Sequence, residues 1–169
     1  MIPERRLLVL DEGTSSTRAL LYALDGRLVA TAQQEITQYY PQPGWVEHDP
    51  VEIWERTLAC ARDMVERAGG AGRIAAIGIT NQRETAVAWD RSSGKPLARA
   101  IVWQDRRTAE ACAALREAGH EPAVSAATGL VLDPYFSATK WRWMIDHVPD
   151  VTAAGDRLAL GTVESWLVW

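Results

Sequence analysis

The chain has 169 residues, of which 47% are hydrophobic and 24% charged, and its formal net charge is −4. This length and composition predict a globular protein with a real core, and the net acidity argues against nucleic acid as a main partner. No apolar run is long enough to span a bilayer, so we expect a cytoplasmic protein without a membrane span. Cys60 and Cys112 lack metal-ligand spacing and are predicted to be buried thiols.

The first third of the chain predicts a β-meander. Strands are expected over 7–10, 18–24 and 28–36. The Asp25-Gly26 pair between the second and third of these strands is typical of a two-residue hairpin turn. The segment 39–45 contains two prolines and a glycine, which predict a loop.

A helix is expected shortly after this loop. Asp49 is a suitable N-cap, Pro50 occupies the first helical position, and Glu52 stands where a capping box has its acidic residue. The apolar residues that recur at helical spacing are Trp54, Leu58, Ala61 and Val65. The Gly69-Gly70 pair is expected to end the helix.

The rest of the chain predicts strands and helices in alternation. The continuous apolar run 74–79 is expected to be a buried strand, and the polar residues 80–85 follow its carboxyl end. The further elements expected are a hairpin over 86–90 and 97–102, helices over 105–118 and 136–147, a short strand over 158–160, and the first turns of a helix over 164–169. The pattern is that of an α/β protein.

The segment from Asp11 to Arg18 has the residue types of a phosphate-binding turn. An apolar strand ends in a carboxylate, a glycine and four hydroxyl side chains follow, and an arginine closes the segment. Gly13 allows backbone N–H groups to approach an anion, and Asp11 can hold a metal ion. The segment has neither the Walker A nor the G-x-G-x-x-G spacing, so a plain hairpin turn rich in small polar residues is the alternative.

A second set of residues suits a small, hydroxyl-rich ligand. Arg83 and Glu84 place a fixed donor beside a fixed acceptor at the end of a predicted strand, and a polyol hydroxyl needs both. Trp103 and Tyr135 offer aromatic walls for a carbon skeleton. The alternative is a surface ion pair of little energetic consequence, with aromatic residues that only pack.

Six blocks of sequence, taken in order, resemble the glycerol kinases of the FGGY carbohydrate-kinase family. They are 11–18 (DEGTSSTR), 43–50 (PGWVEHDP), 78–85 (GITNQRET), 101–108 (IVWQDRRT), 128–137 (TGLVLDPYFS) and 161–167 (GTVESWL). The resemblance implies the actin/hexokinase-type (ribonuclease H-like) ATPase fold, with a mixed sheet flanked by helices. It also implies that residues 1–169 form an incomplete N-terminal domain, and that the full-length protein is a homo-oligomer.

The resemblance implies a chemistry, the transfer of a phosphoryl group from ATP, with Mg²⁺, to glycerol. The residues implied to contact the nucleotide phosphates are Thr14, Ser15, Ser16 and Arg18, and Asp11 is implied to hold Mg²⁺. Those implied to bind the glycerol hydroxyls are Arg83, Glu84 and Tyr135, and Trp103 is implied to pack on the glycerol carbons. A kinase for another small polyol or sugar is the alternative within the family, and the block around Asn81-Gln82-Arg83-Glu84 argues against it.

Two departures from the family pattern stand out. The catalytic aspartate of the family, in a Gly-Asp-Gln motif, lies beyond Trp169, so we expect a fragment that is inactive alone. A non-catalytic polyol-binding or interaction module is the alternative. Glu12 stands where the family usually has glutamine, and we hypothesise that an ionised carboxylate there repels the nucleotide phosphates and weakens ATP binding.

Overall fold

A computed structural model describes residues 4–169 and divides them into two compact units. Unit 1 contains residues 4–37, 49–82 and 168. Unit 2 contains residues 38–48, 83–167 and 169. Unit 1 has one four-stranded sheet, unit 2 has two two-stranded sheets, and each unit has its own cluster of buried apolar residues. Within residues 4–169, no helix has the length and apolarity needed to cross a membrane.

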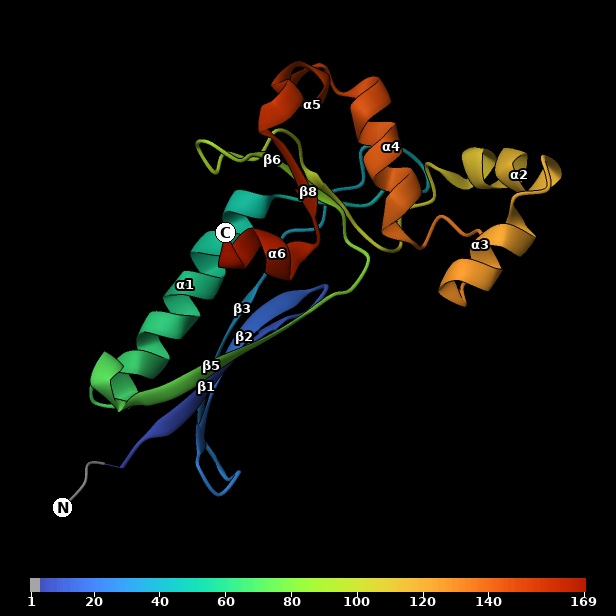
Figure 1. Ribbon diagram of the computed structural model, residues 1–169. Helices are drawn as coiled ribbons and strands as arrows, with labels where there is room; N and C mark the ends of the chain where they lie inside the picture. Colours follow the sequence, from blue (N-terminus) through green and yellow to red (C-terminus); the bar gives the residue numbers. More distant parts are fainter. Residues whose placement is uncertain (1–3) are drawn as a thin grey trace. The chain divides into compact units, whose positions relative to one another are not determined.

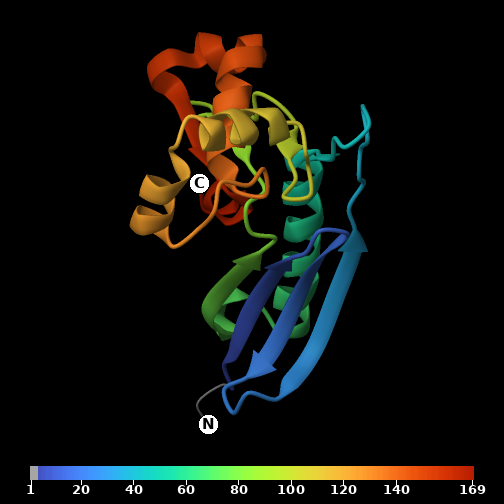
Figure 2. The same cartoon turned by 90° about the vertical axis from the view of Figure 1, so that its right-hand side faces the viewer.

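Unit 1 is built on a mixed four-stranded sheet with the order β3-β2-β1-β5. Its strands are β1 (Arg6–Glu12), β2 (Ser16–Ala23), β3 (Leu28–Glu35) and β5 (Ile74–Asn81). The strands β1, β2 and β3 are antiparallel and lie side by side, and β5 runs parallel to β1 (Figure 1, Figure 2). The predicted meander is therefore confirmed, but the predicted two-residue turn at Asp25-Gly26 is wrong. The loop has three residues, 24–26, because the Ala23 N–H donates to the Arg27 carbonyl at 2.9 Å, and Gly26 takes a φ of 88° at its end.

The helix α1 (Pro50–Arg67) begins where its cap predicts. The Asp49 carboxylate accepts a hydrogen bond from the Val51 N–H at 2.9 Å, which satisfies one of the unpaired N–H groups of the first turn. The expected capping box does not form, because the Glu52 carboxylate accepts from the backbone N–H and the hydroxyl of Thr37 instead. The helix ends before Gly69 and Gly70, both at positive φ, and the short helix η1 (Ala71–Arg73) follows.

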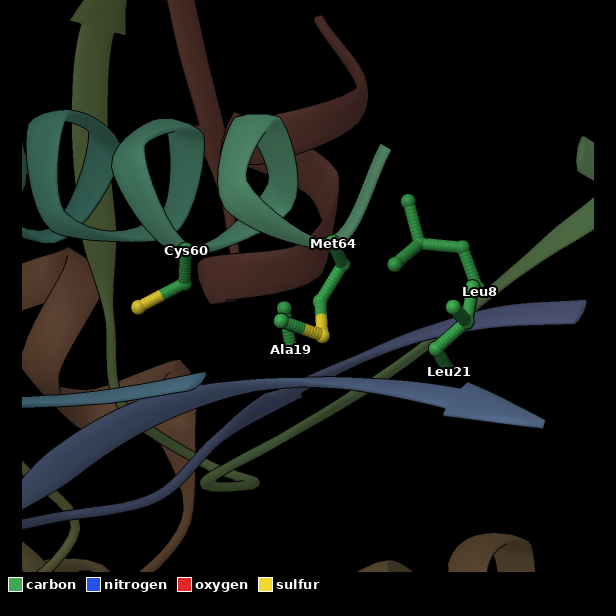
Figure 3. Close-up of a cluster of buried hydrophobic side chains, with 5 residues drawn as sticks. All are labelled: Leu8, Ala19, Leu21, Cys60 and Met64. Carbon is green, nitrogen blue, oxygen red and sulfur yellow. The ribbon is translucent and has the colours of Figure 1, made fainter. Parts of the chain in front are cut away.

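One face of α1 closes the core of unit 1 against the sheet. Figure 3 shows this core, in which Cys60 and Met64 from α1 meet Leu8, Ala19 and Leu21 from β1 and β2. The buried positions of α1 are Pro50, Ile53, Thr57, Cys60 and Met64. The helical spacing expected for Trp54, Leu58, Ala61 and Val65 is confirmed, since all four lie in α1. Ala61 and Val65 pack against this core, whereas Trp54 is 43% exposed.

The strand β5 forms as expected, but the expectation that it is buried is wrong. Ile77 is 60% exposed, and β5 is the outermost strand of the sheet beside β1. The helix α1 packs against β1, β2 and β3, so β5 receives little cover from it. A continuous apolar run predicts a strand well, but its burial depends on what packs against the sheet.

Unit 2 contains two small antiparallel ladders and most of the helices. The strand β4 (Glu47–His48) pairs with β7 (Ala100–Ile101), and β6 (Val87–Asp90) pairs with β8 (Leu158–Gly161). The helices are α2 (Ala109–Glu117), α3 (Glu121–Thr128), α4 (Ser137–His147), α5 (Pro149–Ala154), η2 (Gly155–Arg157) and α6 (Val163–Val168). The helices α4 and α5 pack on each other and on β6.

The sequence predicts part of this arrangement. The strand β8 and the helices α4 and α6 lie where expected. The expected hairpin over 86–90 and 97–102 is present as the isolated bridges Ala86–Ile101 and Trp89–Pro96. The helix α2 starts at Ala109 rather than at residue 105, because the Asp105 carboxylate binds the Arg107 side chain and the Val46 N–H. The helices α3 and α5 were not expected, and β4 was not either. Cys60 and Cys112 are buried free thiols, as predicted.

Candidate functional site

The turn between β1 and β2 contains the residues in which the sequence predicts a phosphate-binding segment, and the N–H of its glycine is hydrogen-bonded within the turn. The Gly13 N–H donates to the Ser16 carbonyl at 3.0 Å, which folds residues 13–16 into a tight loop. A Cβ atom on Gly13 would lie only 3.0 Å from the same carbonyl oxygen, so the turn favours glycine on steric grounds. We call residues 13–16 the phosphate turn.

The hydroxyl side chains of the phosphate turn differ in their surroundings. Ser15 is exposed and Thr14 is half-buried. Ser16 is buried, and its hydroxyl accepts a hydrogen bond from the Gln33 Nε2 at 3.0 Å. Among the three hydroxyls predicted to contact phosphates, Ser15 is therefore the most accessible to a ligand.

Asp11 and Arg18 face each other across the two strands that the turn joins. They are register partners, and their side chains form a 2.9 Å ion pair that is partly exposed. No group of three or more His, Cys, Asp or Glu side chains among residues 4–169 is placed to hold a metal ion. Mg²⁺ commonly binds one or two carboxylates together with phosphate oxygens and water. Asp11 therefore fits a magnesium ion that arrives with nucleotide phosphates, and does not form a protein cage for one.

Glu12 points away from solvent, in contrast to the hypothesis drawn from the sequence. Its side chain is 0% exposed, and Oε1 accepts from the hydroxyls of Thr17 at 2.5 Å and Thr57 at 2.7 Å. Oε2 has no hydrogen-bond partner among the described residues. Burial raises the pKa of the Glu12 carboxyl, and the two hydroxyl bonds oppose that rise. The expected repulsion of phosphates therefore lacks an exposed carboxylate to produce it.

Gln82 connects the end of β5 to the phosphate turn, a role that we did not predict. Its N–H donates to the Glu12 carbonyl at 2.5 Å, and its side-chain Nε2 donates to the Gly13 carbonyl at 3.2 Å. Gln82 is buried, with 7% of its surface exposed. A signal was present in the sequence, since Gln82 directly precedes the Arg83-Glu84 pair.

Glu84 is the central acceptor of a second cluster, which lies in unit 2. Its Oε2 accepts from both the backbone N–H of Ser137 at 2.9 Å and the Ser137 hydroxyl at 2.8 Å. Ser137 is the first residue of α4, so the carboxylate lies at the positive end of that helix. Among the described residues, Glu84 is the only non-glycine residue at positive φ, with a value of 67°. Ser137 is a second residue that we did not predict.

Trp103 and Tyr135 form an aromatic pair in the same cluster. Their ring centroids are 5.8 Å apart and the rings meet edge to face at 63°. The backbone N–H of Trp103 donates to the Thr85 hydroxyl at 3.2 Å, and the backbone N–H of Tyr135 donates to the Asp133 carboxylate at 2.8 Å. We call Glu84, Trp103, Tyr135 and Ser137 the polyol cluster.

Arg83 is exposed and directly precedes Glu84 in the chain. No ion pair joins Arg83 to Glu84 within residues 4–169, because the Glu84 carboxylate binds Ser137 instead. The ion pair of the alternative is therefore not formed among the described residues, whereas its aromatic packing agrees with the contact between Trp103 and Tyr135. A free guanidinium next to a fixed carboxylate keeps both a donor and an acceptor available for hydroxyl groups.

Comparison with known proteins identifies the family. A model described as "FGGY family of carbohydrate kinases, N-terminal domain" matches residues 6–169. The chain belongs to the FGGY family of carbohydrate kinases. The glycerol kinase of Aromatoleum aromaticum is 60% identical over 167 residues, which cover 96% of this chain and 34% of that protein. The glycerol kinase of Paracidovorax citrulli is 57% identical over 166 residues, which cover 96% of this chain and 33% of that protein.

Solved structures of FGGY kinases share the fold. The crystal structure of Plasmodium falciparum glycerol kinase with ADP matches with a TM-score of 0.89 and 31% identity, covering 98% of this chain and 34% of that chain. A xylulose kinase from Lactobacillus acidophilus matches with a TM-score of 0.84 at 20% identity, covering 97% and 32%. The expected actin/hexokinase-type α/β fold is thus confirmed. The chain spans about a third of the length of the FGGY relatives that it matches.

Proposed function

We propose that the protein is a glycerol kinase, which transfers the γ-phosphoryl group of ATP to a terminal hydroxyl of glycerol and forms glycerol 3-phosphate. The observation that carries this proposal is the polyol cluster, in which a carboxylate fixed by α4 lies with an aromatic pair beside an exposed arginine. The identity of 55–60% to proteins named glycerol kinase supports it.

In this proposal the polyol cluster binds the three-carbon substrate by matching donors to acceptors. A hydroxyl group donates to the Glu84 carboxylate while it accepts from the Arg83 guanidinium, and the Tyr135 hydroxyl serves a neighbouring oxygen. Trp103 covers the carbon chain with its ring. A site that hydrogen-bonds several hydroxyls discriminates strongly against analogues that lack one of them, because the unmatched polar groups remain desolvated.

We propose that the phosphate turn binds the nucleotide phosphates through Thr14, Ser15, Ser16 and the Arg18 guanidinium. Asp11 would then hold Mg²⁺ together with phosphate oxygens, and the ion would neutralise charge on the transferred group. Phosphoryl transfer depends mainly on positioning and electrostatic stabilisation, which backbone N–H groups, hydroxyls and a cation supply. The solved glycerol kinase relative contains ADP, which supports a nucleotide in this family.

We propose further that residues 1–169 do not phosphorylate glycerol by themselves. The resemblance assigns the proton acceptor for the alcohol to an aspartate in a Gly-Asp-Gln motif, and this motif does not occur within residues 1–169. The cytoplasmic location and the homo-oligomer implied by the resemblance stay predictions.

The test measures ATP-dependent phosphorylation by the polypeptide encoded by the whole reading frame that contains residues 1–169. We expect turnover of glycerol with Mg²⁺, and much lower turnover of xylulose and gluconate. The E84Q variant keeps the shape of the side chain but loses the charge. Its kcat/KM for glycerol should fall about ten- to a hundred-fold, because a hydrogen bond to a charged group is lost. The E117Q variant, in an exposed residue of α2, is the matched control.

Preference for another sugar would assign the chain to a different kinase of the family. Glycerol binding without any turnover by the whole polypeptide would favour the alternative of a non-catalytic polyol-binding module. Turnover by residues 1–169 alone would overturn the proposal that this segment lacks a proton acceptor.

A further inference from the structure

Lys140, on α4, is buried in a way that lysines seldom are. Its side chain is 0% exposed. Lys95 and Lys140 are the two lysines of the chain, whereas the total of lysines and arginines is 18. The chain therefore uses arginine at nearly all its cationic positions and has a compact ammonium group at this buried one. Burying a charged amine costs free energy unless it is well paired, so a specific role is expected.

The Lys140 ammonium binds the backbone that leads into α4. Nζ donates to the carbonyl oxygen of Tyr135 and lies 3.4 Å from the carbonyl oxygen of Phe136. Both carbonyls belong to the short segment between the Asp133 turn and Ser137, where α4 begins. The same side chain therefore fixes the residue that carries the aromatic hydroxyl and the residue that precedes the helix start.

Three carboxylates of unit 2 act electrostatically on the Lys140 ammonium. Burial lowers the pKa of Lys140 to about 8, and the carboxylates of Asp105, Glu84 and Asp133, with the Cys112 thiol, oppose this fall. The Glu84 carboxylate thus acts on Lys140 electrostatically, and it also hydrogen-bonds Ser137 at the start of the same helix. This arrangement links Lys140 to both polar members of the polyol cluster.

We propose that Lys140 is a positioning residue for polyol binding. Its ammonium holds the Tyr135 backbone and the first turn of α4, and through Ser137 it holds the Glu84 carboxylate, in the geometry that receives neighbouring hydroxyls. This inference rests on the proposed glycerol kinase function. Lys140 itself has no contact with solvent, so it acts through Tyr135 and Ser137 and does not touch the substrate.

A purely structural lysine and a positioning lysine predict different results for K140M. Methionine has a similar length and is apolar, and replacing a buried charge by an apolar side chain is often neutral or stabilising. If Lys140 only fills space, K140M leaves substrate binding unchanged. If Lys140 positions Tyr135 and Glu84, K140M weakens glycerol binding although the fold persists.

The experiment compares the whole wild-type polypeptide with K140M and with the control K95M, in which the exposed Lys95 is replaced. We expect K140M to raise the KM for glycerol about tenfold and to leave the KM for ATP within about twofold. Hydrogen–deuterium exchange should become faster at the amides of Tyr135, Phe136 and Ser137 in K140M, and should be unchanged in K95M.

The two proposals fail in different ways. A wild-type protein that phosphorylates no polyol would refute the glycerol kinase function. An active wild type whose K140M variant keeps both its KM for glycerol and its exchange rates would refute the role of Lys140. Should K140M fail to fold, K140Q removes the charge and keeps an N–H donor for the carbonyls of Tyr135 and Phe136. An unchanged KM for glycerol together with unchanged exchange at residues 135–137 in K140Q would then overturn the inference.

Discussion

Replacing Glu12 with glutamine should remove a pH-dependent destabilisation from unit 1. The prediction rests on a count of protons. Glu12 Oε1 lies 2.5 Å from the Thr17 hydroxyl and 2.7 Å from the Thr57 hydroxyl, and the Thr57 hydroxyl also lies 2.7 Å from the Ile53 carbonyl. The two hydroxyls also lie 3.3 Å from each other, so they supply two protons for four contacts. An ionised Glu12 would leave two contacts without a proton, whereas a neutral carboxyl supplies a third proton.

The electrostatic surroundings of Glu12 favour the same neutral form. Burial raises the pKa of Glu12 above its ordinary value of 4.5, the hydroxyls of Thr17 and Thr57 lower it, and the charge of Asp11 raises it further. Between the ordinary pKa and the raised one, the folded state binds more protons than the unfolded chain. The free energy of unfolding therefore falls as pH rises through that window, by up to about 1.4 kcal/mol per pH unit, and levels off above it.

A glutamine at position 12 has no proton to lose and satisfies the same contacts. Its amide N–H groups can donate to the Thr17 and Thr57 hydroxyls, which leaves the Thr57 proton for the Ile53 carbonyl. We expect E12Q to unfold with a free energy that lacks the wild-type fall with pH, and to be at least as stable as wild type at pH 8. Because Glu12 is buried, the KM for ATP should change less than about twofold.

The assay is urea unfolding of wild type, E12Q and the control E55Q from pH 5 to pH 9, in buffer without divalent cations. Glu55 lies on the exposed side of α1, so E55Q changes the same charge without changing the buried cluster. The difference in unfolding free energy between E12Q and wild type should grow with pH. A difference that stays constant over this range would mean that Glu12 is ionised when folded, and the proton count would be wrong.

Three further predictions follow from contacts in the two candidate sites. G13A should raise the KM for ATP several-fold, measured at saturating glycerol, because the new Cβ would press on the Ser16 carbonyl at 3.0 Å. Gln82→Ala should also raise the KM for ATP, by about tenfold at most, and should leave the KM for glycerol unchanged, because the bond to the Gly13 carbonyl is lost. Burial lowers the pKa of Lys140 from 10.5 to about 8, so wild type should gain up to about 3 kcal/mol of unfolding free energy relative to K140M as pH rises between these values. Parallel stability curves for wild type and K140M would contradict the last of these.

The sequence predicted well those turns and helix starts that depend only on residues adjacent in the chain. Gly26 marks the connection of β2 to β3 because it takes the positive φ that ends their three-residue loop, and Asp49 starts α1 because its carboxylate binds the Val51 N–H. The phosphate turn was predictable for the same reason, since its glycine and its flanking charges are adjacent in the chain. Arg83 and Glu84 were found because they are neighbours at a strand end.

The contacts that complete the sites join residues far apart in the chain, and no local pattern signals them. Ser137 meets Glu84 across 53 positions, and Gln82 meets Gly13 across 69. Whether a carboxylate such as Glu12 faces solvent or α1 depends on the pairing of β1 with β2 and on the packing of the helix. Lys140 carries no sequence signal beyond the scarcity of lysine. Burial of β5 was misjudged because a continuous apolar run does not tell what packs against the strand.

Three residues that break general rules of protein structure lie in or next to the two candidate sites. Glu84 adopts a positive φ that glycine would adopt at lower cost, Lys140 is a buried cation, and Glu12 is a buried acid. Conformations and burials of this kind persist only where the surrounding structure enforces them, and they concentrate at functional sites. The positive φ of Glu84 directs its carboxylate toward the backbone N–H and the hydroxyl of Ser137, which both donate to it. A glycine there would relieve the backbone and lose the acceptor, which explains why the chain retains the strained residue if this carboxylate binds substrate.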